Sequence, residues 1–169
     1  MGAKDELFME RALKLAEEAL KDGDYGVGAL VVFGDEIISK GRNRVFSLQV
    51  PLAHAEIEAI DKIPSKYFRF RENMTIYSTC EPCIVCAGEI VSTGLRRLVY
   101  GASDPYYGRA GIVAEKGIDV SRVLIGRCEE IFLSNRKELD EKFSSMYPSI
   151  LDCLSGQQQS AAAQSSHHI

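Results

Sequence analysis

The chain has 169 residues, of which 46% are hydrophobic and 26% charged, a balance typical of one globular domain with its own core. No run approaches the roughly eighteen consecutive apolar residues of a membrane-spanning helix, and the charged N-terminus does not resemble a secretory signal. A net charge of −4 argues against a protein built mainly to bind phosphate backbones. Five cysteines, three of them within seven residues, predict reduced thiols that serve a metal, and hence a cytoplasmic location.

The first half of the chain predicts two helices and three strands. Apolar residues at three- and four-residue spacing predict a first helix that ends at Asp22-Gly23-Asp24. Segments 28–32 and 37–40 flank turn residues and therefore predict a β-hairpin. A short helix over 54–60 and a strand over 75–78 are expected next.

In the second half, helices and strands alternate. The expected elements are a helix over about 83–93 that stops at Gly94, a strand over 98–100, a short helix over 112–116, a strand over 120–125 and a last helix over about 129–143. Such alternation implies βαβ crossovers, and hence a partly parallel sheet that is covered on both faces. The fold class is therefore α/β: a three-layer α/β/α sandwich around a mixed sheet of about five strands.

The domain is expected to cover residues 3–154. Residues 155–169 contain almost only Ser, Gln, Ala, Gly and His, a composition that cannot repay the entropy of ordering, so they are predicted to form a disordered tail. His167 and His168 lie in that tail and are not candidates for a functional site.

One short constellation predicts a metal. His54 stands in Pro51-Leu-Ala-His54-Ala-Glu56, and 29 residues later comes Cys80-Glu81-Pro82-Cys83-Ile-Val-Cys86. Pro82 suits the entrance of a helix, so Cys83 and Cys86 fall on one face of its first turn. With His54 they supply three zinc ligands and leave a fourth position for water or hydroxide, as in catalytic zinc sites.

Glu56 is the expected catalytic residue. It lies two residues from His54 and is free to take a proton from a zinc-bound water, whose pKa the metal lowers to about 7, and to pass it to a leaving amine. Three other interpretations compete with this one: a buried core histidine, a redox pair of cysteines, and a structural zinc site with Cys80 as fourth ligand. The last leaves Glu56 without a role, and Cys80 precedes Pro82 outside the helix, so we favour catalytic zinc.

His-x-Glu followed by Pro-Cys-x-x-Cys resembles the signature of the zinc-dependent cytidine and deoxycytidylate deaminase superfamily, over roughly residues 7–126. The resemblance implies one Zn²⁺ per chain on His54, Cys83 and Cys86, proton transfer by Glu56, and a cytidine deaminase-like fold with strands 4 and 5 parallel. It also implies a homodimer.

The same resemblance suggests where a substrate is bound. Residues 27–29 resemble a strand that lines the base pocket, and residues 41–43 resemble a stretch whose asparagine contacts the substrate; Gly26 and Leu52 depart from residues that are common in relatives. The implied substrate-binding residues are Val27, Gly28, Ala29, Asn43, Ala55, Asp104 and Tyr107.

The sequence leaves the substrate open among three classes: a free nucleobase, a free nucleoside or nucleotide, and adenosine in a tRNA anticodon loop. Residues 78–83 resemble small guanine deaminases, whereas residues 101–111 resemble tRNA adenosine deaminases, with Tyr106 and Tyr107 where a lysine is common. These tyrosines would stack on a base or simply cap the loop. A basic stretch over 66–71, with Arg96, Arg97 and Arg109, is the candidate RNA surface, but a solvated loop with inward-packing aromatics is favoured there.

Because the chain is net acidic and its last predicted helix is rich in Glu and Asp, we expect a small-molecule substrate: a free nucleobase such as guanine or cytosine, or a nucleoside or nucleotide. The alternative is a tRNA-specific adenosine deaminase that converts A to I at the anticodon wobble position. A third possibility is a catalytically inert zinc-containing binding module.

Overall fold

The computed structural model describes residues 2–148. The chain divides into two units, one up to Arg136 and the other from Lys137 onward, and each is described here by itself. The expected tail over 155–169 and Cys153 lie outside the described residues. Among the described helices, none has the length and apolar character needed to cross a bilayer.

A five-stranded mixed sheet forms the centre of the first unit. The sheet has the order β2-β1-β3-β4-β5 and consists of β1 (Gly28–Phe33), β2 (Glu36–Arg42), β3 (Met74–Cys80), β4 (Arg97–Ala102) and β5 (Asp119–Arg122). Strand β1 is antiparallel to β2 and β3, whereas β3, β4 and β5 are mutually parallel. The predicted mixed sheet, including its parallel strands 4 and 5, is confirmed.

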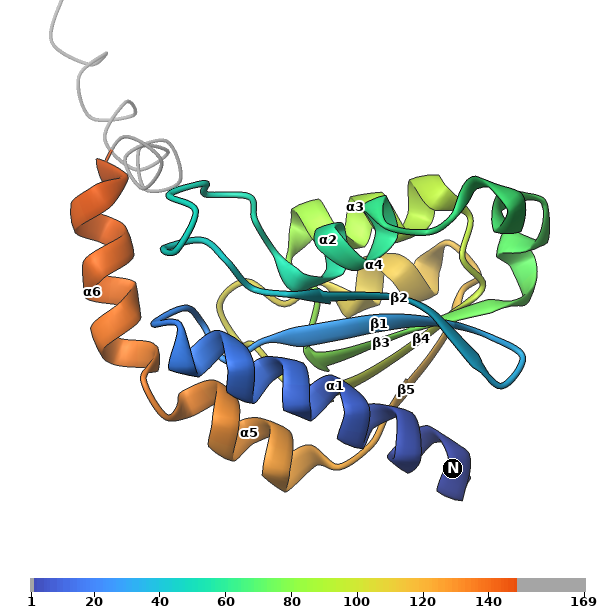
Figure 1. Ribbon diagram of the computed structural model, residues 1–169, viewed down its shortest axis with the longest axis horizontal. Coiled ribbons are helices and arrows are strands. Elements are labelled where there is room, and N and C mark those ends of the chain that lie inside the picture. Colours follow the sequence, from blue (N-terminus) through green and yellow to red (C-terminus); the bar gives the residue numbers. More distant parts are fainter. Residues whose placement is uncertain (1, 149–169) are drawn as a thin grey trace, which may run out of the picture. The chain divides into compact units, whose positions relative to one another are not determined.

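Helices cover both faces of the sheet (Figure 1). Helices α1 (Ala3–Lys21) and α5 (Ile125–Leu133) lie on one face. Helices α2 (Ala55–Asp61), α3 (Ile84–Thr93) and α4 (Ala110–Glu115) lie on the other. Strands β1, β3 and β4 are almost wholly buried between these layers, which explains their continuous apolar sequences.

Close approach at Gly41 in β2 fixes the position of α2. A Cβ on this glycine would lie 2.1 Å from the carbonyl oxygen of Ala55 and 2.5 Å from the amide nitrogen of Ala59. The helix backbone therefore rests directly on the strand, a contact that no residue with a side chain allows. Since α2 starts at the residue after His54, this contact also determines where His54 and Glu56 lie.

An ion pair ties the start of α1 to the sheet. The Arg97 guanidinium donates to both carboxylate oxygens of Asp5, at 2.7 and 2.9 Å, and the Tyr77 hydroxyl donates to Oδ1 at 2.8 Å. The Arg97 hydrogen bonds, with that of Tyr77, outweigh the effect of burial and lower the pKa of Asp5 to about 2.

The C-terminal part of the prediction is wrong in two places. The strand expected over 120–125 ends at Arg122, because Leu124 adopts a left-handed backbone with φ of 50° and starts α5. The single helix expected over 129–143 is instead two helices, α5 and α6 (Arg136–Met146). At the break, the Ser134 hydroxyl donates to the Ile131 carbonyl at 2.9 Å, a local bond that competes with helix continuation.

A 3₁₀ helix, η1 (Ser65–Asn73), forms where the sequence predicts a loop. Its Tyr67 and Phe70 rings pack on Phe33 of β1, with ring centroids 5.6 and 5.4 Å away. The inward packing favoured for this segment is therefore observed for two of its three aromatic residues, while Phe68 is 40% exposed.

We predict that Gly41→Ala destabilises the protein by roughly 1–3 kcal/mol or more, because the new methyl group overlaps the α2 backbone. Thermal unfolding measures the loss. Gly126→Ala, in α5, is the matched control, because a Cβ at this position would extend into open space. Alanine also stabilises a helix by about 1 kcal/mol relative to glycine. Equal stability of Gly41→Ala and wild type would contradict the close contact.

Acid should weaken the protein through Asp5. Its pKa is about 2 in the folded chain against an ordinary 3.8, so its stabilising contribution is complete above about pH 4 and is lost as the pH falls through 2. Because Arg97 is partly exposed, we expect roughly 1–2 kcal/mol. Urea unfolding at pH 5, 3.5 and 2.5 should show a steeper loss for wild type than for Asp5→Asn; parallel losses would exclude this contribution.

Candidate metal centre and active site

His54 lies immediately before α2, in extended backbone. Its Nε2 atom is 3.1 Å from the carbonyl oxygen of Pro51. With the proton on Nε2 donated to this carbonyl, Nδ1 keeps its lone pair and faces the two cysteines. An outer hydrogen bond of this kind is what orients a metal-binding histidine.

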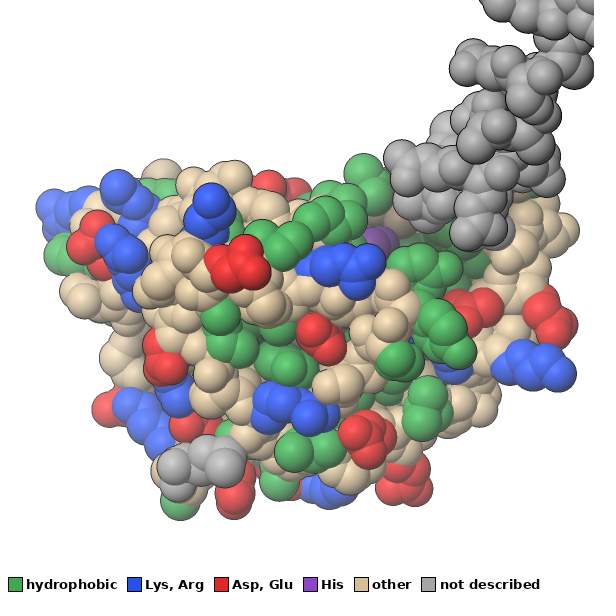
Figure 2. Space-filling model, turned by 180° about the vertical axis from the view of Figure 1, so that it is seen from behind, with side chains coloured by type: hydrophobic (Ala, Val, Ile, Leu, Met, Phe, Trp, Pro, Cys, Tyr) green, Lys and Arg blue, Asp and Glu red, His purple; other side chains and the backbone are tan. Residues whose placement is uncertain are grey.

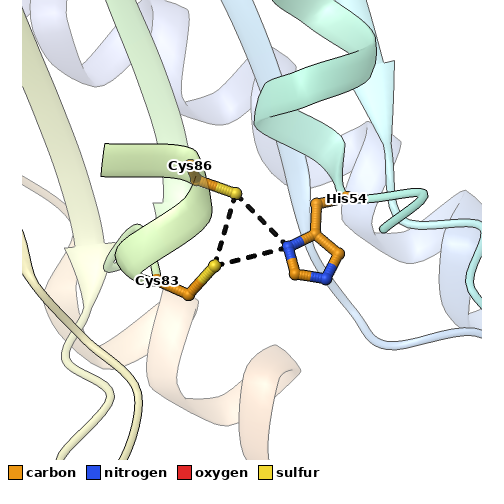
Figure 3. Close-up of side chains that lie close together, drawn as sticks. All are labelled: His54, Cys83 and Cys86. Carbon is orange, nitrogen blue, oxygen red and sulfur yellow. Dashed lines mark hydrogen bonds between the residues drawn. The ribbon is translucent and has the colours of Figure 1, made fainter. Parts of the chain in front are cut away.

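The two cysteines come from the start of α3. Cys83 is the residue before the helix, also in extended backbone, and Cys86 lies in its first turn, so Pro82 stands one position further out than expected. Nδ1 of His54 is 3.5 Å from the Cys83 Sγ and 3.3 Å from the Cys86 Sγ, and the two sulfur atoms are 3.6 Å apart (Figure 3).

These distances fit zinc. Tetrahedral Zn²⁺ with ordinary bonds to sulfur and nitrogen places its ligand atoms roughly 3.5–3.8 Å apart, close to the triangle observed. His54, Cys83 and Cys86 are the group of possible ligands that the described residues bring together, and Cys80 is not part of it. The donor set, two soft sulfurs and an imidazole nitrogen, is also one that zinc prefers. The three residues can thus form the zinc site expected from the sequence.

The surroundings favour a thiolate at Cys83. Hydrogen bonding with Cys86, followed by that with His54, outweighs burial and lowers the pKa of Cys83 to about 4. The same contact with Cys83, together with burial, raises the pKa of Cys86. Burial alone would lower the pKa of His54, but the bond and charge of Cys83 and the charge of Glu56 raise it.

Glu56 lies against this triangle from the second position of α2. Its side chain is buried, with Oε2 3.6 Å from the Cys86 sulfur. Oε1 accepts a hydrogen bond of 3.0 Å from the hydroxyl of Ser78. Burial raises the pKa of Glu56. Ser78 was not singled out from the sequence, although a serine in the middle of an apolar strand is a sign of a buried polar partner.

Cys80 is placed apart from the metal ligands, as its position before Pro82 suggested. It is the last residue of β3, is buried, and pairs with Ala102 of the neighbouring strand. Burial raises the pKa of this thiol well above its usual value. Like Cys83 and Cys86, it takes part in no disulfide with a described residue.

The expected substrate-binding residues fall into two groups. Val27, Gly28, Ala29, Asn43 and Ala55 are buried around the start of β1 and of α2. The backbone amide of Asn43 donates to the Val27 carbonyl at 2.9 Å, and the side-chain Oδ1 of Asn43 accepts from the backbone amide of Val45 at 3.2 Å. The Gly28 amide donates to the Thr79 hydroxyl at 3.0 Å. The contact between Asn43 and Val27 joins the end of β2 to the segment before β1, and that between Gly28 and Thr79 joins the start of β1 to β3.

The second group, Asp104 and Tyr107, belongs to the segment 103–110 between β4 and α4. Oδ1 of Asp104 accepts from the amides of Tyr106 and Tyr107, at 3.1 and 3.2 Å, and Oδ2 lies 3.3 Å from the Arg136 guanidinium. Both Asp104 oxygens thus contact the protein itself. Tyr106 is 77% and Tyr107 44% exposed.

Three of the basic candidates have acidic or carbonyl partners within the protein, although Arg71 and Arg96 line the same surface hollow. Arg97 is bound to Asp5 and Asp119, Arg96 lies 3.9 Å from Glu72, and Arg109 contacts the carbonyls of Tyr106 and Gly108. On one face of the molecule, acidic and basic side chains are interspersed with hydrophobic ones (Figure 2).

We predict that His54→Ala, Cys83→Ser and Cys86→Ser each reduce bound zinc by tenfold or more after dialysis, because each removes one of three ligands. Cys80→Ala is the discriminating control and should retain one zinc per chain. Elemental analysis of the dialysed proteins gives the stoichiometry. Loss of zinc from Cys80→Ala to the same extent would point instead to a four-ligand structural site.

Comparison with known proteins agrees with this geometry. Residues 3–102 match the family model described as the cytidine and deoxycytidylate deaminase zinc-binding region. The chain is 38% identical over 109 residues to the tRNA-specific adenosine deaminase of Bacillus subtilis, covering 64% of this chain and 68% of that protein. It is 35% identical over 113 residues to tRNA-specific adenosine deaminase 2 of Xenopus laevis, covering 63% and 65%. The chain thus spans about two thirds of the length of these curated relatives.

Solved structures show the same fold. One, from a study of A-to-I editing by tRNA:A34 deaminases at the wobble position of transfer RNA, matches 73% of this chain and 97% of its own, with a TM-score of 0.67 and 32% identity. Another, a diaminohydroxyphosphoribosylaminopyrimidine deaminase/5-amino-6-(5-phosphoribosylamino)uracil reductase from Thermotoga maritima, matches 80% of this chain and 42% of its own, with a TM-score of 0.66 and 28% identity.

Proposed function

Because the chain belongs to the cytidine and deoxycytidylate deaminase zinc-binding family, we propose that it is a hydrolytic deaminase that acts on adenosine in the anticodon loop of a tRNA, at the wobble position. The overall reaction replaces the exocyclic amine by oxygen from water and releases ammonia. The observation that carries the hydrolytic part is the triangle of His54, Cys83 and Cys86 with the Glu56 carboxylate beside it.

The choice of tRNA reverses the preference drawn from net charge. The relatives at 35–38% identity are named as tRNA deaminases, and one solved structure at 32% identity comes from work on tRNA:A34 deaminases. Net charge is a weak guide here, because proteins recognise single-stranded RNA loops largely by stacking and hydrogen bonding to splayed bases. A free nucleobase or nucleoside remains the alternative substrate class.

Different residues are proposed to bind zinc, to transfer protons and to orient the proton-transfer group. Zinc, when bound by His54, Cys83 and Cys86, supplies a Lewis acid that lowers the pKa of water to about 7. Glu56 is proposed to take up the two protons of the attacking water one after the other and to deliver the first to the ring nitrogen and the second to the departing amine. The Ser78 hydroxyl holds Oε1 of Glu56, which leaves Oε2 on the side of Cys86.

The base is proposed to lie against the buried residues at the start of β1 and α2, namely Val27, Gly28, Ala29, Asn43 and Ala55. Their small side chains suit a flat ring. The exposed rings of Tyr106 and Tyr107 are proposed to stack on neighbouring unpaired bases, an interaction worth about 1–3 kcal/mol per base in other proteins. Asp104 is assigned a supporting role, since both its oxygens contact the protein. The homodimer and the cytoplasmic location remain predictions from the sequence.

Glu56→Gln tests the proposal. With an anticodon stem-loop that carries adenosine at the wobble position, wild type should form inosine and ammonia. The variant should be slower by about 10²–10⁴-fold while it retains zinc, because it keeps the side-chain shape and loses the proton acceptor. Glu115→Gln, an exposed glutamate of α4, is the matched control and should behave as wild type.

Parallel assays with guanine, cytosine and the free nucleosides separate the substrate classes. Turnover of one free base, and none of the stem-loop, would replace the tRNA proposal by a small-molecule deaminase. A zinc-loaded, folded protein that releases ammonia from no substrate would instead favour the inert binding module.

A further inference from the structure

The Glu81 side chain joins the metal-binding turn to the segment 103–110. Glu81 stands between β3 and Pro82, two residues before Cys83. Its Oε1 accepts the amide of Ala110 at 3.1 Å, and its Oε2 accepts the amide of Asp104 at 3.3 Å. One carboxylate thus holds both ends of the segment. Neither Glu81 nor this connection was predicted from the sequence.

The rest of the segment lies against the same turn. The Arg109 amide donates to the Pro82 carbonyl at 2.8 Å, and Gly108 forms an isolated β-bridge with Cys83. A Cβ on Gly108 would lie 2.4 Å from Cδ of Glu81 and 2.5 Å from the Asp104 carbonyl oxygen. The carboxylate therefore rests directly on the Gly108 backbone, without room for a side chain between them.

The two tyrosines are carried between these fixed points. Tyr106 is largely exposed, whereas Tyr107 is 44% exposed and has the Arg136 guanidinium 5.7 Å from its ring centre. The Asp104 side chain accepts the backbone amides of both tyrosines, and Glu81 accepts the backbone amide of Asp104. Their distance from the metal ligands is thus set through main-chain contacts that converge on Glu81. Hydrogen bonds to an ionised carboxylate are about twice as strong as neutral ones, which suits such a fixed connection.

We propose that Glu81 is a positioning residue, which sets the place of Tyr106 and Tyr107 relative to the metal ligands and thereby the affinity for the RNA around the target adenosine. This inference rests on the proposed function. It assigns Glu81 no part in zinc binding or in proton transfer, because both its oxygens accept backbone amides.

Glu81→Gln is the decisive variant. The amide keeps the size of the side chain, but its NH₂ group meets a backbone N–H where an oxygen accepted before. We expect KM for the stem-loop to rise about 5–30-fold, with kcat changed less than about threefold and zinc content unchanged. Glu115→Gln serves again as the control and should leave both constants unchanged.

Tyr107→Ala, alone and combined with Glu81→Gln, tests the route of the effect. If Glu81 acts through the tyrosine, the double variant should have nearly the KM of the more impaired single variant, because neither change can remove the same contact twice. Multiplying effects would overturn the proposal. So would a loss of zinc in proportion to activity, or a fall in kcat at constant KM.

Amide hydrogen exchange followed by NMR separates this inference from the proposed function. The amides of Asp104 and Ala110 should exchange at least tenfold faster in Glu81→Gln than in wild type, whatever the substrate. Unchanged exchange would disprove the positioning role. Faster exchange in a protein that deaminates no RNA would reject the proposed function and the RNA affinity, and would leave the anchoring of the segment established.

Discussion

Two helix N-termini meet at the centre of this protein, and most of the structure follows from that arrangement. His54 and Cys83 each occupy the residue before a helix, and α2 and α3 direct the positive ends of their backbone dipoles at the same small volume. Positive ends repel one another unless anionic groups lie between them. The surroundings lower the pKa of Cys83, so its thiolate is such a group, and the site thereby also stabilises the helix pair that presents it.

The same arrangement has an energetic cost. Glu56 and Cys86 are buried, and a buried anion is expensive unless an opposite charge or hydrogen-bond donors surround it. Ser78 supplies one donor, and a divalent cation, when bound by His54, Cys83 and Cys86, would supply the opposite charge. The close contact between Gly41 and the backbone of α2 keeps Glu56 in its buried position. Removal of the metal should thus affect the stability of this part of the fold, not its chemistry alone.

The sequence predicted the sheet and the grouping of His54, Cys83 and Cys86 because both depend on local patterns. Apolar strands bounded by glycine, and a Pro-Cys-x-x-Cys stretch at a helix start, carry their meaning within a few residues. The break between α5 and α6 carries no glycine or proline, and Leu124 continues an apolar run although its backbone is left-handed, so both were missed. Glu81 was missed because its partners are Asp104 and Ala110, more than twenty residues away. The preference for a small substrate failed to anticipate the relatives because net charge averages over the whole surface.

The attachment of the segment 103–110 through Glu81 determines which of its positions tolerate substitution. The carboxylate accepts only main-chain amides, which every residue except proline provides, and Gly108 is the position where a side chain does not fit. Exposed positions such as 106 and 107 are therefore free to vary without loosening the attachment. The side chains at these two positions can therefore be exchanged without a change in the main chain that carries them.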